Sequence, residues 1–165
     1  MPPAVVDAFE FCRRKERREG EVPVAELPRL ARETVDGSGT LKWSVQGGQD
    51  MRGNPGMDLT VNGTVRLQCQ RCMQPMEFVI DSAASTVLAN DEDSADALDE
   101  LLADEPVEVI VGSHALDLMV LIEDEALLAL PPAPRHEACE AAELADVQAA
   151  GKKESPFAVL GKLKR

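Results

Sequence analysis

The chain has few aromatic residues: Phe and Trp make up only 3% of it, and Tyr is absent. A core without aromatic rings must be filled by aliphatic side chains and Met, and the hydrophobic content of 44% is sufficient for this. Global disorder is therefore excluded. A length of 165 residues suits one folded domain with tails.

Basic residues are also scarce. The 17 Lys and Arg face 30 Asp and Glu, which gives a formal net charge of −13 and a pI near 4.5. Between residues 73 and 134 there is no Lys or Arg at all. Generic binding to nucleic acid depends on Lys and Arg that release counterions, so an acidic field opposes it. A basic protein is the partner that this charge favours, although a local basic patch could still contact RNA.

The sequence has no long uninterrupted apolar run. Residues 1–10 lack the basic start and apolar core of a signal peptide, and charged residues interrupt the apolar stretch over 115–134. We therefore expect a cytoplasmic protein without a membrane segment. Disulfides rarely persist in that compartment, where a Cys-x-x-Cys pair more often binds a metal or takes part in catalysis.

Familiar catalytic patterns are missing too. There is no Gly-rich phosphate loop, no Ser-His-Asp set and no His-Glu-x-x-His motif. The adjacent acids Glu123, Asp124 and Glu125 would point about 100° apart on a helix, so they cannot form one compact acid–base pair. They predict a solvated or partner-facing side of a helix, and the chain is expected to be neither an enzyme nor a binder of a small-molecule substrate.

Two corners of the sequence carry soft metal ligands. Cys69 and Cys72 are separated by two residues, as are His136 and Cys139. Three thiols and one imidazole are the ligand count of a tetrahedral structural zinc site. Three alternatives stay open. Cys69 can be a core residue with Cys139 in a tail, Cys69 and Cys72 can form a redox pair, or the corner can hold a catalytic zinc.

Period-two alternation is clearest over residues 59–69, where apolar and polar residues alternate. This pattern predicts a half-buried strand. A second strand-like run after Cys72 makes the first corner the tip of a β-hairpin. Further strands are expected over Val5–Phe11, Leu41–Val45 and Pro106–Val111.

Helices are expected over Ala25–Val35 and Ala115–Leu130, the second buried around most of its circumference. The fold class is therefore α+β, an antiparallel sheet, curled towards a barrel, packed by a long buried helix. We expect one domain over residues 1–139, with an acidic mobile loop at about 90–105. Residues 140–165 are expected to form a flexible linker and a short helical motif.

Candidate RNA contacts are few. They form one dense run and two isolated positions beside the Cys corners: Arg13, Arg14, Lys15, Arg17, Arg18, Arg71 and Arg135. The run can equally be a solvated strand end, and the two isolated arginines can neutralise a thiolate-rich metal site. In the tail, Phe157, Leu160 and Leu163 share one helical face, which suits either a partner groove or the protein's own core.

Four segments in this order resemble the YceD family, named for large ribosomal RNA subunit accumulation. They are Val65–Cys72, Leu118–Pro131, the Pro-x-His…Cys segment Pro134–Cys139, and Pro156–Leu160. The resemblance spans roughly residues 55 to 165. It implies a non-enzymatic bacterial or plastid factor in ribosome biogenesis that supports the accumulation or processing of 23S rRNA. Family genes commonly lie beside that of a small zinc-binding protein of the large subunit. The implied partners are large-subunit rRNA or its precursor, a basic large-subunit ribosomal protein, or both.

Overall fold

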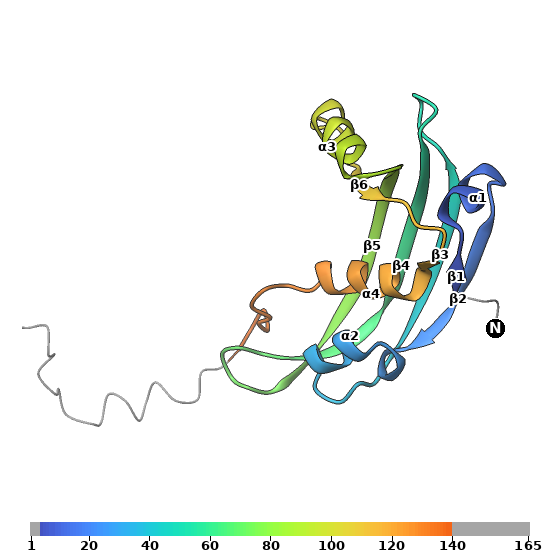
Figure 1. The fold of residues 1–165 in the computed structure, drawn as a ribbon. Helices are drawn as coiled ribbons and strands as arrows, with labels where there is room; N and C mark the ends of the chain where they lie inside the picture. The colour runs from blue at the N-terminus through green and yellow to red at the C-terminus, as the bar shows by residue number, and fades with distance from the viewer. Residues whose placement is uncertain (1–3, 140–165) are drawn as a thin grey trace, which may run out of the picture.

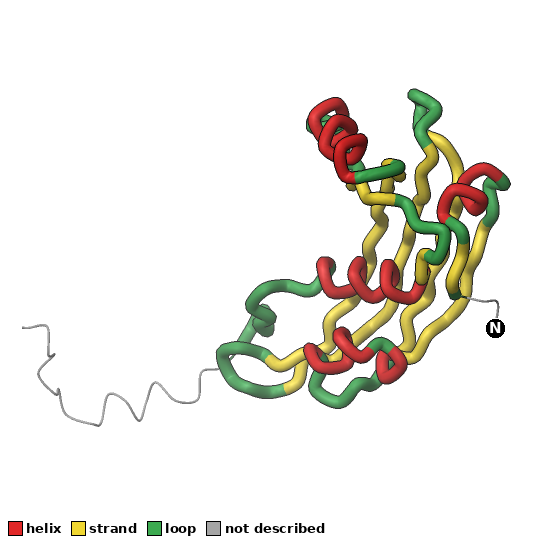
Figure 2. Tube along the Cα trace, viewed as in Figure 1, coloured by secondary structure: helices red, strands yellow, loops and turns green. Residues whose placement is uncertain are grey.

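The computed structural model describes residues 4–139, in which helices cover one face of a five-stranded sheet (Figures 1 and 2). In chain order the elements are β1 (Val5–Val6), α1 (Ala8–Arg13), β2 (Arg17–Pro23), a 3₁₀ turn (Val24–Glu26), α2 (Pro28–Glu33), β3 (Thr40–Gln49), β4 (Pro55–Gln68), β5 (Pro75–Ala89), α3 (Glu92–Leu101), β6 (Glu108–Val111), β7 (Leu116–Asp117) and α4 (Leu118–Leu128).

The strand order of the main sheet is β2-β3-β4-β5-β6. The first four strands are antiparallel neighbours, and β6 pairs parallel with β5 through residues 86–89. β1 and β7 form a separate two-stranded pair. The α+β class with antiparallel pairing is confirmed, but the sheet stays open and does not close into a barrel.

The alternation that predicted β4 also determines which face of the sheet is buried. Leu59, Val61, Val65 and Leu67 all lie in the core, on the face that α4 crosses. The neighbouring strand β3 adds Leu41, Trp43 and Val45 to the same core. No helix in the described residues is long and apolar enough to cross a membrane.

The prediction of a strand over Val5–Phe11 is wrong beyond its first residues. Asp7 caps a helix instead, because its carboxylate accepts hydrogen bonds of 3.0 Å from the N–H groups of Phe9 and Glu10. The resulting α1 buries Phe11 and Cys12 against β3 and β4. The Cys12 thiol lies 3.0 Å from the carbonyl of Gly56, which makes it a packed core residue.

The acidic segment around residues 90–105 was expected to be a loop, and this is wrong for most of it. α3 occupies Glu92–Leu101 and begins with a capping box between Asp91 and Ser94. No residue of α3 is buried, and only Leu102, directly after it, enters the interior. The acidic side chains of α3 are therefore exposed, and the helix lies at one end of the sheet (Figure 1).

The long helix expected over Ala115–Leu130 is shorter, and it is not buried all round. The chain first forms β7, and the side chain of Asp117 then caps α4 at the N–H of Met119. One side of α4 enters the core through Leu118, Ile122 and Ala126. On the other side Leu128 is 74% exposed, so α4 retains an uncovered apolar surface. The helix expected over Ala25–Val35 is likewise reduced to the 3₁₀ turn and α2, which starts at Pro28.

Candidate functional site

The first Cys corner is the tip of the β4–β5 hairpin, as predicted. The N–H of Cys69 donates to the carbonyl of Gln74 over 2.9 Å, and the N–H of Met73 donates back to Cys69 over 2.9 Å. Met73 completes the reversal with a φ of 60°. This turn presents the side chains of Cys69 and Cys72 to the second corner.

The second corner follows α4 and reaches the hairpin tip through a backbone contact. The N–H of Gln70 donates to the carbonyl of Pro134 over 2.8 Å. This bond brings His136 and Cys139 beside the first pair. The two corners, separated by the whole of β5 through α4, therefore meet in space.

The four predicted ligands form one cluster, with ligand atoms within 4.8 Å of one another. The Sγ atoms of Cys69 and Cys139 are 3.9 Å apart, and Cys72 Sγ lies 3.3 Å from His136 Nδ1. Zinc–sulfur and zinc–nitrogen bonds of ordinary length give tetrahedral edges of about 3.8 Å and about 3.6 Å. A Cys₃His group of these dimensions could hold a metal ion.

The surroundings of the cluster also orient its ligands. The second ring nitrogen of His136, Nε2, lies 3.3 Å from the carbonyl of Pro75, a contact that would leave Nδ1 free for a metal. The N–H of Arg71 points at Cys69 Sγ over 3.5 Å. Cys69 is fully buried, whereas the other three ligands are partly exposed.

The sulfurs are not electrostatically equivalent. Burial opposes ionisation of Cys69, but N–H groups of Cys72, His136 and Arg71 outweigh it and lower its pKa to about 5. Contact with Cys72, burial and the nearby Cys69 raise the pKa of Cys139 to about 11. Without a metal, repulsion between neighbouring thiolates opposes ionisation of all three thiols. A bound divalent cation would stabilise the three thiolates at the same time.

The candidate RNA-contacting residues do not converge on one surface. Arg71 and Arg135 are exposed beside the cluster, and neither forms an ion pair with another described residue. The basic run lies at the end of the sheet opposite the hairpin tip. There Arg17 is the register neighbour of Gln46 in β3, and Gln46 is the register neighbour of Asp58 in β4.

The basic run is also largely neutralised by its own neighbours. Arg13 and Arg14 contact Glu10, while Arg18 contacts Glu16 over 3.1 Å. Arg17 pairs with Glu19 over 2.8 Å. Lys15 alone in this run has no ion pair within residues 4–139, and it sits in the turn after α1 with a φ of 52°.

The three acids of α4 do not share one solvated face, contrary to the prediction. Glu123 is buried and accepts hydrogen bonds from the N–H groups of Arg29 and Leu30, at 2.6 and 3.1 Å, and from the Arg29 side chain. Asp124 pairs with the same guanidinium, and Glu125 contacts the hydroxyl of Ser82. The sequence did not indicate Arg29 as a contact of these acids, because Glu123 lies 94 residues away from it. Phe157, Leu160 and Leu163 lie outside the described residues.

The sequence of the chain is similar to that of one known protein family. The family profile "Large ribosomal RNA subunit accumulation protein YceD" matches residues 57–164. The chain belongs to the YceD family. A protein of that name from Haemophilus influenzae is 32% identical over 178 residues, covering 99% of this chain and 96% of the relative. No solved structure matches the chain.

The YceD profile includes both ligand corners and α4, and the resemblance seen in the sequence is therefore confirmed. The similarity to the Haemophilus protein extends further, because it includes nearly all of the N-terminal part that the profile leaves out. β2, β3 and the basic run thus belong to the region shared with a YceD relative.

Proposed function

We propose that this chain is a non-enzymatic cytoplasmic factor that supports the accumulation of large-subunit rRNA. It would do so by binding that rRNA or its precursor, a basic large-subunit ribosomal protein, or both. The observation that carries the proposal is membership of the YceD family, with a relative of that name aligned along nearly the whole chain.

Charge favours protein contact over direct RNA contact. The chain carries a net charge of −13, and α3 exposes its acids without a buried residue. The basic run, the most concentrated RNA candidate, is offset by Glu10, Glu16 and Glu19. A basic protein would be drawn to this surface, with a salt-sensitive association.

The Cys₃His cluster is proposed to bind a structural zinc ion. Cys69, Cys72, His136 and Cys139 would complete the tetrahedral shell and leave no position for substrate. The ion would therefore pin the hairpin tip to the chain after α4 without supplying chemistry. Arg71 and Arg135 would then border the site, either as phosphate contacts or as partners for its negative charge.

The tail residues Phe157, Leu160 and Leu163 are proposed as further partner contacts. Together with the basic end at Lys162, Lys164 and Arg165, they combine apolar anchors with positive charge. Such a segment suits a hydrophobic groove on a partner.

A tagged pull-down from native lysate, with and without nuclease, tests the proposal. Enriched 23S precursor, with ribosomal proteins lost after nuclease treatment, would support direct docking on RNA. A basic ribosomal protein retained after nuclease treatment would support protein binding. If neither is enriched over a tag-only control, the proposed function is wrong.

A thiol redox role for Cys69 and Cys72 is the second candidate, favoured by the lowered pKa of Cys69. Its complete burial argues against it, because a redox thiolate must be reached by its substrate. Fast alkylation of the untreated protein would support the redox role. Alkylation that becomes fast only after a chelator is added would support the zinc site.

A further inference from the structure

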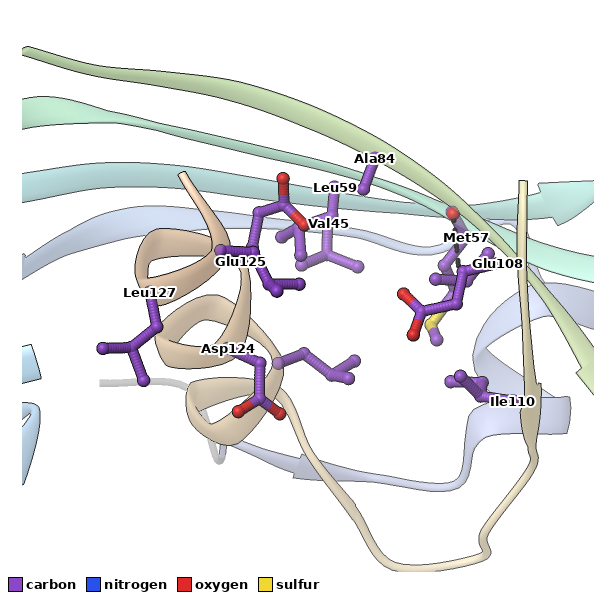
Figure 3. Close-up of a pocket in the computed structure, with 12 residues that line it drawn as sticks. Val45, Met57, Leu59, Ala84, Glu108, Ile110, Asp124, Glu125 and Leu127 are labelled. Carbon is purple, nitrogen blue, oxygen red and sulfur yellow. Dashed lines mark hydrogen bonds between the residues drawn. The ribbon is translucent and has the colours of Figure 1, made fainter. Parts of the chain in front are cut away.

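A pocket of about 380 Å³ opens between α4 and β6 on the helix-covered face of the sheet (Figure 3). Its floor is apolar and comes from three neighbouring strands, through Val45 of β3, Leu59 of β4 and Ala84 of β5. Leu121 of α4 and Ile110 of β6 form apolar walls. This size and lining suit the insertion of an apolar group.

The border of the pocket is acidic. Glu108 comes from β6, while Asp124 and Glu125 come from α4, and no Lys or Arg among residues 4–139 lines the pocket (Figure 3). Asp124 is paired with Arg29, but Glu108 has no ion pair within the part of the chain that the structure describes. The border therefore favours a cation beside the apolar group and opposes phosphate or a fatty-acid carboxylate.

A protein side chain fits the pocket better than a small polar ligand does. Small-molecule sites usually present a few unengaged polar groups that orient the ligand. Here the hydroxyl of Thr86 already donates to the carbonyl of Met57 over 3.2 Å, which leaves the carboxylates as the polar lining. Leu128, another lining residue, is 74% exposed and extends the apolar lining out to the protein surface, as at protein-docking sites.

We propose that this pocket is the docking site for a segment of a basic partner protein. The segment inserts an aliphatic side chain over Leu59 and Ala84 and places a flanking Lys or Arg against Glu108. This inference rests on the protein-binding branch of the proposed function, for which it names the surface and the chemistry recognised. The exposed acids of α3 contribute only long-range attraction.

Methyl NMR of the full-length protein, labelled at its Met methyl groups, tests the location directly. Met57 lines the pocket and is 3% exposed, whereas Met51 is fully exposed and Met73 lies at the distant hairpin tip. The probes are purified basic proteins of the large ribosomal subunit, added one at a time. The expected result is a probe that shifts the Met57 signal and leaves those of Met51 and Met73 unchanged.

Two variants with a matched control make the test quantitative. E108K should weaken binding about tenfold by reversing one charge at the pocket, and A84W should do so by filling the floor. E100K makes the same charge change on exposed α3 and should alter affinity less than about threefold. Circular dichroism and melting temperature check that each variant is folded.

The outcomes separate the site from the proposed function. A probe that binds without shifting Met57, or that E108K and E100K weaken equally, would overturn the docking site and leave the function intact. If none of the ribosomal proteins binds the wild-type chain, the protein-binding branch fails and the docking site fails with it. A shift of Met57 caused by an rRNA fragment would also overturn the proposed partner class.

Discussion

Arg29 and Glu123 lie 94 residues apart in the sequence and form the contact that joins α2 to α4. Arg29 Nε donates to Glu123 Oε2 over 2.8 Å, and the N–H groups of Arg29 and Leu30 donate to the other carboxylate oxygen. Burial opposes ionisation of this carboxyl, but these hydrogen bonds outweigh it and hold the pKa of Glu123 below its ordinary value. The pair therefore stabilises the helical layer over the sheet.

We expect E123Q to lower the free energy of unfolding by about 2 kcal/mol at pH 7, because it removes a charge-assisted contact at a buried position. D124N, on the 46% exposed neighbour, should cost less than about 1 kcal/mol. Urea unfolding of both variants measures the difference. Equal effects of the two substitutions would contradict the structural role of Glu123.

The same carboxyl predicts a pH dependence. A pKa that is lower in the folded state contributes stability above the ordinary value of 4.5, and this stability is lost as the pH falls through the folded-state pKa. The stability gap between wild type and E123Q should therefore narrow below pH 4.5. Urea titrations from pH 7 to pH 3 follow the gap, and a constant gap would show that ionisation of Glu123 is not responsible.

Metal removal should destabilise the end of the sheet at the hairpin tip. We expect the natively purified protein to contain one zinc per chain by elemental mass spectrometry, and a chelator to lower its melting temperature. H136A should lose the metal, whereas H114A, at the other histidine, should retain it. Full zinc content in H136A would exclude His136 as a ligand.

Two neighbouring glycines of β3 provide a test of the packing of α1. A Cβ at position 47 would lie 2.5 Å from the carbonyl oxygen of Phe11, whereas one at position 48 would meet no atom of the described residues within 4 Å. G47A should therefore cost about 1–3 kcal/mol, and G48A less than about 1 kcal/mol. Thermal or urea unfolding distinguishes them, and similar costs would mean that α1 does not approach β3 this closely.

Charge reversal in the basic run tests the RNA branch of the proposed function. R13E together with R17E should weaken association with 23S precursor if this surface contacts RNA. Glu10 and Glu19 already pair with these two residues, so the reversal would leave an uncompensated cluster of carboxylates that repels RNA. RNA association unchanged in electrophoretic mobility assays would exclude the run as a contact, and R71E would then be the next variant to measure.

Local patterns in the sequence were enough to predict the strands β3 to β6 and the two ligand pairs, but not the edge strand β2. The alternation over β4 specified both the strand and its buried face, and the two-residue Cys spacing placed one ligand pair at the hairpin tip. That the second pair reaches the first is visible only in the fold, through the contact of Gln70 with Pro134. Ligand spacing alone could not distinguish this meeting from a chance pattern.

The wrong predictions of secondary structure and burial have local and long-range causes. The caps Asp7 and Asp91 were readable signals, because each is followed three residues later by a residue suited to a helix start, but the apolar and acidic compositions around them masked the pattern. The later start of α4 has a local signal in its cap Asp117, but the pairing of Leu116 with Val6 has none. The burial of Glu123 likewise depends on Arg29, which no window of the sequence connects to it.

We expect the contact between Gln70 and Pro134 to form late in folding. It closes a long loop that contains β5, α3, β6, β7 and α4, so its closure costs more entropy than the turns of the β3–β4–β5 meander do. The β3–β4–β5 meander needs only short connections and can form first. A newly made chain would thus hold Cys69 and Cys72 on a finished hairpin, exposed to whichever metal arrives, before His136 and Cys139 complete the cluster. If the cluster binds zinc as proposed, the yield of fully folded protein would then depend on the zinc available while the chain folds.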